Sequence, residues 1–188
     1  WVVFVNFTIS LAVFPSITAN IYSPEANANK VDGEIKYNAN PPEGRFYGDL
    51  FVPVYCFLLF NIFDFLGRFM AGKCPQLLPR QILFPLSLSR AVFIPLFMMC
   101  NVVEVGTSYM PVVFSHIAWP ILFITLLAFS NGFLCTLEFM NAPSMVPEVL
   151  QSTAGRMMCF FTSSGLLFGC VVSFFLHYLL CSCNPILR

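Results

Sequence analysis

The chain has 188 residues, of which 58% are hydrophobic and 10% are charged, and its nine basic and nine acidic residues give a formal net charge of zero. Soluble domains carry about 25% charged residues, so this chain has too few polar side chains to cover a surface exposed to water. The composition excludes an ordinary water-soluble domain and indicates an integral membrane protein, and the zero net charge gives no indication of nucleic-acid binding.

Five apolar stretches are long enough to cross a membrane. A bilayer core requires about 20 apolar residues in a helix, and we expect helices because an isolated strand would leave its backbone groups unpaired in lipid. The predicted transmembrane helices cover residues 1–22, 50–70, 81–101, 117–140 and 156–180. Because the chain starts with Trp1 rather than Met and is apolar from its first residues, we expect it to be part of a longer protein.

The connections between these helices differ in length and charge. They cover residues 23–49, 71–80, 102–116 and 141–155, followed by a tail at 181–188. The first is rich in Pro, Gly, Asn and charged residues, so we expect an irregular, flexible loop. Basic residues near span ends, including Lys73, Arg80 and Arg156, predict that 71–80 and 141–155 are cytoplasmic. The other two loops and the tail are then extracellular.

In chain order, the first two predicted helices hold the features that bear most on function. In the first helix, Pro15 predicts a kink just after Phe14. The second carries four polar or aromatic residues at i, i+4, i+7 and i+11, which share one stripe roughly 60° wide on an α-helix. These residues are Phe57, Asn61, Asp64 and Arg68. We expect this stripe to face the bundle interior or a water-filled cavity.

The two charges of this stripe require an explanation. A charge at the bilayer centre costs about 3 kcal/mol, and opposite charges at i,i+4, such as Asp64 and Arg68, can pair. One interpretation is a structural link between helices; the other is a substrate pathway. The second is favoured because a buried ion pair is often no more stabilising than a hydrophobic replacement. A neutral polyhydroxylated ligand suits these donors and acceptors, and Phe57 can stack on a flat ring. A sugar joined to an aromatic base fits, although other polar solutes also would.

The third and fourth predicted helices contain polar residues to which we assign structural roles. Arg90 is expected to reach toward the cytoplasm or to bind neighbouring carbonyl groups. Ser130, Asn131 and Gly132 are expected to allow close helix packing and an interhelical hydrogen bond. Glu138 lies near the predicted cytoplasmic end of its helix, so we expect a solvated carboxylate without a functional role.

The fifth predicted helix contains Gly165 and Gly169, a G-x-x-x-G match that predicts a close helix contact within the same molecule. The chain has no G-x-S-x-G or H-E-x-x-H motif and no phosphate-binding glycine loop. We therefore expect no catalytic residues, no metal site and no cofactor.

Five short segments carry a recognisable pattern in a fixed order along the chain. They are FPSIT at 14–18, FNIFDFLGR at 60–68, SRAVFIPLF at 89–97 followed by CN, FSNGF at 129–133 and TAG at 153–155. Together they resemble the equilibrative nucleoside transporters, a family of facilitative nucleoside solute carriers. The resemblance implies that the five helices are helices seven to eleven of a major-facilitator-like transporter with eleven helices. The N-terminal half of the same protein would then supply the other wall of the site.

The resemblance also implies roles for individual residues. Asp64 and Arg68 would contact a nucleoside in a central cavity, Phe57 and Asn61 would face that cavity, and Phe14 would lie close to it. Purine and pyrimidine nucleosides would be carried by alternating access of two halves, and the protein would reside in the lipid bilayer of the plasma membrane. Two alternatives remain open: a proton-coupled nucleoside or nucleobase transporter in which Asp64 titrates, and a membrane scaffold that transports nothing.

Overall fold

The computed structural model describes residues 1–21, 27–31, 34–37, 44–46, 48, 50–74, 78–100, 113–114 and 116–181. Five helical stretches among them are long and apolar enough to cross a membrane, which confirms the predicted class. They run over Val2–Asn20, Val52–Lys73, Arg80–Met98, Ala118–Met145 and Glu148–Leu179. The predicted tail beyond residue 181 and most of the predicted loop at 102–116 lie outside the described residues.

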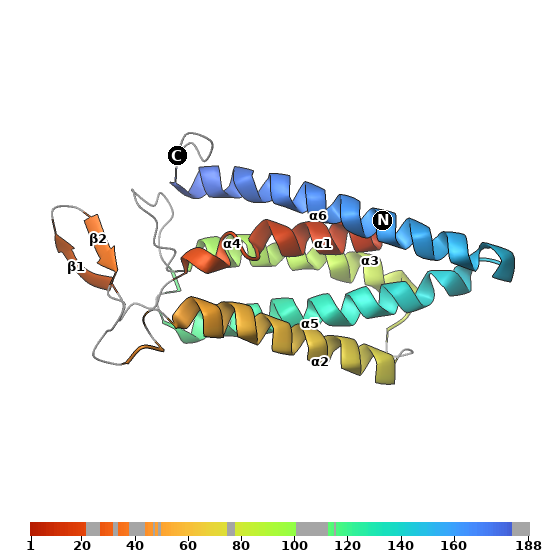
Figure 1. The fold of residues 1–188 in the computed structure, drawn as a ribbon, viewed down its shortest axis with the longest axis horizontal. Helices are drawn as coiled ribbons and strands as arrows, with labels where there is room; N and C mark the ends of the chain where they lie inside the picture. Colours follow the sequence, from red (N-terminus) through yellow and green to blue (C-terminus); the bar gives the residue numbers. More distant parts are fainter. Residues whose placement is uncertain are drawn as a thin grey trace.

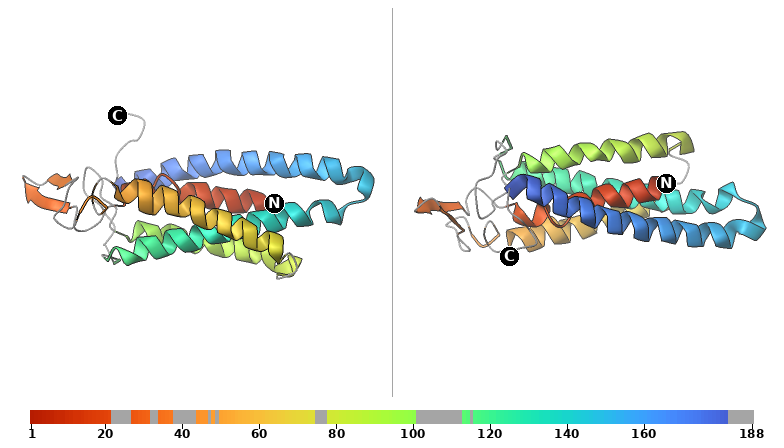
Figure 2. Two further views of the ribbon diagram at one scale, coloured as in Figure 1. Left: turned by 60° about the horizontal axis from the view of Figure 1, so that its bottom comes forward. Right: turned by 90° about the horizontal axis from the view of Figure 1, so that it is seen from above.

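The helices form one elongated bundle (Figures 1 and 2). Its α-helices are α1 (Val2–Val13), α2 (Leu59–Lys73), α3 (Arg80–Ser89), α4 (Phe93–Met98), α5 (Ala118–Asn141) and α6 (Gln151–Cys181). The most extensive contacts join α2 to α5 and α1 to α6. In Figure 1, α6 runs along one side, α2 and α5 along the other, and α1 lies between them.

Most spans include irregular segments. In the first span, the α-helix ends at Val13. The next residue, Phe14, is extended with φ −105° and ψ 129°, because a residue before proline avoids the α conformation. A short 3₁₀ helix, η1 (Thr18–Asn20), follows, so the predicted kink is an end of the α-helix. The second span begins with a π-helical segment, η3 (Val52–Leu58). The third is divided between α3 and α4 by a 3₁₀ turn, η4 (Arg90–Val92).

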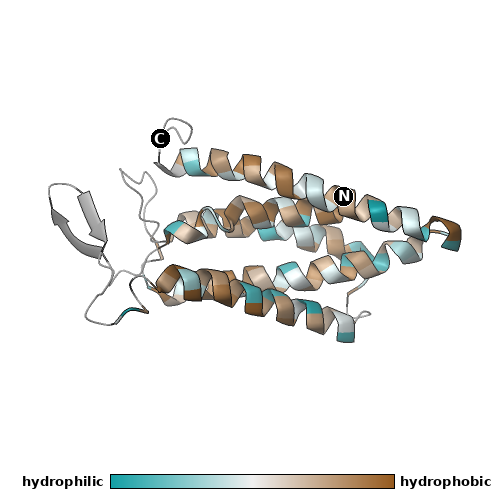
Figure 3. Ribbon diagram, in the orientation of Figure 1, coloured by the Kyte–Doolittle hydropathy of each residue, from teal (hydrophilic) through white to brown (hydrophobic). Residues whose placement is uncertain are grey.

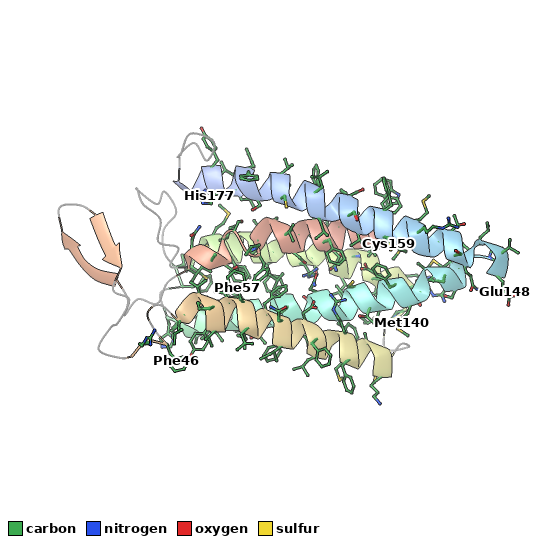
Figure 4. The ribbon with its side chains drawn as sticks, in the orientation of Figure 1. Phe46, Phe57, Met140, Glu148, Cys159 and His177 are labelled. Carbon is green, nitrogen blue, oxygen red and sulfur yellow. The ribbon has the colours of Figure 1, made fainter. Side chains whose placement is uncertain are left out.

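The connection between α5 and α6 is shorter than the sequence predicted. After α5 the chain forms two 3₁₀ turns, η5 (Pro143–Met145) and η6 (Glu148–Leu150). Helix α6 then begins at Gln151 rather than at the predicted residue 156. This connection forms one tip of the bundle, where Figure 4 labels Glu148.

A β-hairpin projects from the opposite end of the bundle (Figure 1). Its strands β1 (Asn27–Val31) and β2 (Glu34–Tyr37) pair antiparallel, with an irregular register between Ala28 and Val31. The prediction of an irregular conformation was wrong for these two strands. Asp32-Gly33 lies between the strands, and Asp-Gly is a strong sequence signal of a tight hairpin turn.

Apolar side chains line both the interior and the outer faces of the bundle. Ile17, Phe51, Phe97 and Leu127 are fully buried, whereas α6 exposes many large apolar side chains, as expected of a helix in lipid. Figure 3 shows that apolar residues occur along the length of α6. The predicted G-x-x-x-G contact is confirmed. A Cβ added to Gly165 would lie 2.7 Å from the carbonyl oxygen of Phe4, and one on Gly169 would lie 2.8 Å from the Cβ of Leu11. Helices α1 and α6 are therefore in backbone contact.

Candidate functional site

We call the stripe predicted in the second span, Phe57, Asn61, Asp64 and Arg68, the α2 seam. Its two charged residues form an ion pair on helix α2. Arg68 Nε donates to Asp64 Oδ2 at 2.7 Å, and the side chains are 45% and 15% exposed respectively. Arg68 Nη1 also lies 3.8 Å from Cys135 Sγ on α5. The guanidinium is therefore held at one nitrogen by the carboxylate and still presents part of its surface outward.

The remaining seam residues lie on the exposed side of the bundle. Asn61 is exposed and donates its side-chain amide to the carbonyl oxygen of Phe57 at 2.7 Å. Phe57, in the π-helical segment η3, is 38% exposed. Only 17% of the span that contains α2 is buried within the described residues, the lowest share among the five spans. The seam is thus an open face of this chain, although Asp64 and Arg68 also reach side chains of α5.

An aromatic cluster joins the end of α1 to the start of α2. The Phe14 ring stacks on Phe60 with a centroid separation of 4.0 Å and an interplanar angle of 9°. It also meets Phe57 edge-on at 5.3 Å and 62°. Figure 4 labels Phe57 where α2 begins. Two residues predicted to lie near a ligand, Phe14 and Phe57, are therefore in contact. Phe60 is a third member that sequence reasoning missed, although it belongs to the FNIFDFLGR segment.

Asp64 is linked to the bundle interior through Asn131 on α5. Asn131 Nδ2 donates to Asp64 Oδ1 at 2.7 Å. Its carbonyl oxygen, Oδ1, accepts from Ser10 Oγ at 2.7 Å and from Asn6 Nδ2 at 3.4 Å. The predicted interhelical hydrogen bond is confirmed, but Asn131 also contacts the carboxylate of the α2 seam. Asn131 therefore belongs to the site, and the isolated amide in the apolar run AFSNGFL was the signal for it.

Arg90 lies at the other end of this chain of hydrogen bonds. It is 3% exposed. Its guanidinium donates to Asn6 Oδ1, to Ser10 Oγ at 2.9 Å and to Ser130 Oγ at 3.1 Å. Two backbone carbonyls, those of Asn6 and Leu127, accept at 3.2 Å. The prediction that Arg90 binds neighbouring carbonyls is confirmed, and the alternative that it reaches toward the cytoplasm is wrong. We call Arg90, Asn6, Ser10, Asn131 and Asp64 the polar relay.

Glu138 differs from the sequence prediction. It is 5% exposed, and neither of its carboxylate oxygens has a hydrogen-bond partner among the described residues. The prediction of a solvated carboxylate was wrong, because the span that contains α5 is the most buried of the five and α5 continues past Glu138 to Asn141. Glu138 lines a cavity of about 190 Å³ together with residues that include Trp1, Arg80 and Met158.

Comparison with known proteins decides the family. A model of the nucleoside transporter family matches residues 1–178. The chain belongs to the nucleoside transporter family. It is a multi-pass integral membrane protein by its family and its five apolar spans. Its relatives are named as transporters rather than enzymes.

Three relatives of this family member illustrate the similarity. Equilibrative nucleoside transporter 1 of Homo sapiens is 37% identical over 174 residues, which are 89% of this chain and 33% of that protein. Equilibrative nucleoside transporter 2 of Mus musculus is 35% identical over 176 residues, 93% of this chain and 35% of that protein. Equilibrative nucleoside transporter 4 of Danio rerio is 32% identical over 170 residues, 90% of this chain and 27% of that protein. The chain thus spans about a third of the length of the relatives it matches.

Proposed function

We propose that this chain is the C-terminal part of a facilitative nucleoside carrier that works by alternating access. The observation that carries this function is the Asp64–Arg68 pair on the open face of a membrane-spanning helix. A partly exposed guanidinium is costly against lipid. The open face is therefore best explained as one wall of a wet cavity, whose other wall is an N-terminal half like that of the longer relatives.

The residues at this wall suit a nucleoside. The remaining lone pairs of Asp64 can accept from sugar hydroxyls, and the free N–H groups of Arg68 can donate to hydroxyl or base oxygens. Asn61 adds an exposed amide. The aromatic cluster lies where the end of α1 meets the start of α2, so a base can pack against Phe57 and Phe14 while the sugar meets the ion pair farther along α2. We propose these five residues as the substrate-binding residues, with purine and pyrimidine nucleosides as substrates.

The sidedness of the chain follows from its basic residues. Lys73 ends α2, Arg80 begins α3 and Arg156 lies early in α6. All three lie toward the end of the bundle that carries Glu148, away from the hairpin (Figures 1 and 4). Cytoplasmic connections are enriched in Lys and Arg. We therefore propose that this end is cytoplasmic and that the hairpin is extracellular, in a carrier of the plasma membrane.

Uptake and counterflow test this function. The longest transcript that contains this sequence is expressed in oocytes, and radiolabelled uridine and adenosine are supplied. A facilitative carrier brings the internal concentration up to the external one and no further, and preloaded unlabelled uridine accelerates entry of the label. Accumulation above the external concentration would overturn the facilitative mechanism, and no uptake of any nucleoside by protein at the cell surface would overturn the substrate class.

A further inference from the structure

Arg90 is a buried cation that no carboxylate of the described part of the chain contacts directly. Among the described residues, its hydrogen-bond partners are the side chains of Asn6, Ser10 and Ser130 and two backbone carbonyls, with no carboxylate oxygen in bonding range. Burying a charge in this way is costly unless it is fully hydrogen-bonded. An interhelical link could have been made by a neutral residue, so the retained charge calls for a role beyond packing.

The chemistry of the guanidinium imposes one direction on the polar relay. A guanidinium only donates hydrogen bonds, so Asn6 must present its oxygen to Arg90, which turns Asn6 Nδ2 toward Asn131. Ser10 likewise accepts from Arg90, and its hydroxyl lies 2.7 Å from Asn131 Oδ1 and 2.9 Å from the backbone carbonyl oxygen of Asn6, the two acceptors within reach of its single hydrogen. With its oxygen occupied by these donors, Asn131 has only N–H groups to offer to Asp64.

The relay ends on a group with the opposite property. An ionised carboxylate only accepts, so a chain that starts at Arg90 and ends at Asp64 fixes the side-chain amides of Asn6 and Asn131 in one orientation each. Asn6, Ser10, Asn131 and Arg90 are each 5% exposed or less, so water has little access to compete for these bonds. Asp64 Oδ1 is thereby held by Asn131 and Oδ2 by Arg68. Both carboxylate oxygens are fixed before a solute arrives.

We propose that Arg90 is a positioning residue for substrate binding, which fixes the rotamer of Asp64 through Ser10, Asn6 and Asn131. This inference rests on the proposed function, since it concerns how Asp64 meets a nucleoside. Arg90 itself does not contact the solute. Its loss frees the Asn131 amide to turn its oxygen toward Asp64, which would repel the carboxylate from its present position.

A double-mutant cycle tests this role. For each variant, KM for uridine uptake is measured, and Vmax is divided by the amount of transporter at the cell surface. R90Q is expected to raise KM about tenfold, the effect of one lost hydrogen bond to a charged group, with a smaller change in Vmax. In the Asp64→Asn background R90Q is expected to change KM less than twofold, because the residue it positions has been removed. A purely structural Arg90 would instead lower surface level or Vmax and act equally in both backgrounds.

Two further variants complete the test. Arg80→Gln is the matched control, because Arg80 is an exposed arginine at the start of the helical span that contains Arg90, and its bond is to Ser144; we expect no change in KM. If R90Q does not reach the surface, Ser10→Ala replaces it in the cycle, because this substitution removes one hydrogen bond of the polar relay without a change of charge. We expect Ser10→Ala to raise KM about threefold. Equal effects in both backgrounds overturn the role of Arg90, whereas absence of nucleoside uptake by the unmodified protein overturns the proposed function and this inference with it.

Discussion

Gly132 on α5 lies directly against Asp64 on α2: a Cβ added to Gly132 would sit 1.9 Å from the carbonyl oxygen of Asp64. The contact is reciprocal, because a Cβ on Gly67 would lie 2.2 Å from the carbonyl oxygen of Phe129. The two backbones touch at the level where Asn131 reaches the carboxylate. The close approach of α2 and α5 therefore fixes the position of the α2 backbone that carries Asp64 and Arg68.

Substitution of these glycines should separate the two helices. Gly67→Ala and Gly132→Ala each force backbone atoms apart, and overpacking of this kind costs about 1–3 kcal/mol. We expect the thermal midpoint of the purified protein to fall by several degrees in each variant.

Gly72→Ala supplies the control within the same helix, because a Cβ there meets nothing within 4 Å. Alanine is a better helix former than glycine, so Gly72→Ala should leave the midpoint unchanged or slightly higher. Equal midpoints for Gly67→Ala and Gly72→Ala would show that α2 and α5 are not in backbone contact.

The aromatic cluster should contribute to affinity for the base. Phe57→Ala removes the ring that meets Phe14 edge-on and is partly exposed on the open face. Aromatic pairs are worth about 0.5–1.5 kcal/mol beyond the area they bury, so we expect the concentration of adenosine that half-inhibits uridine uptake to rise roughly three- to tenfold. Leu58→Ala is the control, since Leu58 is 53% exposed and is not part of the aromatic cluster. If the two variants respond alike, Phe57 has no specific contact with the base.

The buried carboxylate of Glu138 should lower the stability of the folded protein. An unpartnered buried polar group costs about 1–3 kcal/mol, and a charged one costs more. Glu138→Gln removes the charge with little change in shape, so we expect a rise in the thermal midpoint of about 2–4 °C per kcal/mol recovered. Glu148→Gln, at an exposed position in η6, should change little. A fall in the midpoint for Glu138→Gln would mean instead that a cation outside the described residues pairs with this carboxylate.

Uptake should not depend on a proton gradient. Asp64 pairs with Arg68 on the same helix and also accepts from Asn131, so the carboxylate of the α2 seam already has a cationic partner. We expect equal initial rates of uridine uptake with and without an imposed inward proton gradient at fixed external pH. A several-fold increase with the gradient would favour the proton-coupled alternative, and its loss in Glu138→Gln would assign the proton to the unpartnered carboxylate.

Much of the architecture could be predicted from local sequence. Twenty consecutive apolar residues can only be a helix in lipid, and the i,i+4 spacing of Asp64 and Arg68 was enough to predict their contact. The π-helical start of the second span and the break at Arg90 depend on tertiary packing and were not visible in the pattern. The hairpin signal Asp32-Gly33 was present in the sequence but was outweighed by polar composition.

The candidate site was only half predictable for a related reason. Spacing on one helix identifies residues that share a face, so it found the members of the α2 seam. It cannot identify partners that lie far away in the chain. Asn131 is separated from Asp64 by 67 positions and Arg90 from Asn6 by 84. Glu138 was misjudged because distance from a helix end says nothing about which helix occupies the centre of the bundle.

The most direct test of the central claim is uridine uptake by the Asp64→Asn and Arg68→Ala variants, measured per transporter at the cell surface. The pair is partly exposed, so its loss should change the free energy of folding by only about 0–1 kcal/mol, and both variants should reach the membrane. If the pair faces the solute, each variant loses at least tenfold in Vmax/KM for uridine. Normal uptake by both variants at normal surface level would contradict the account.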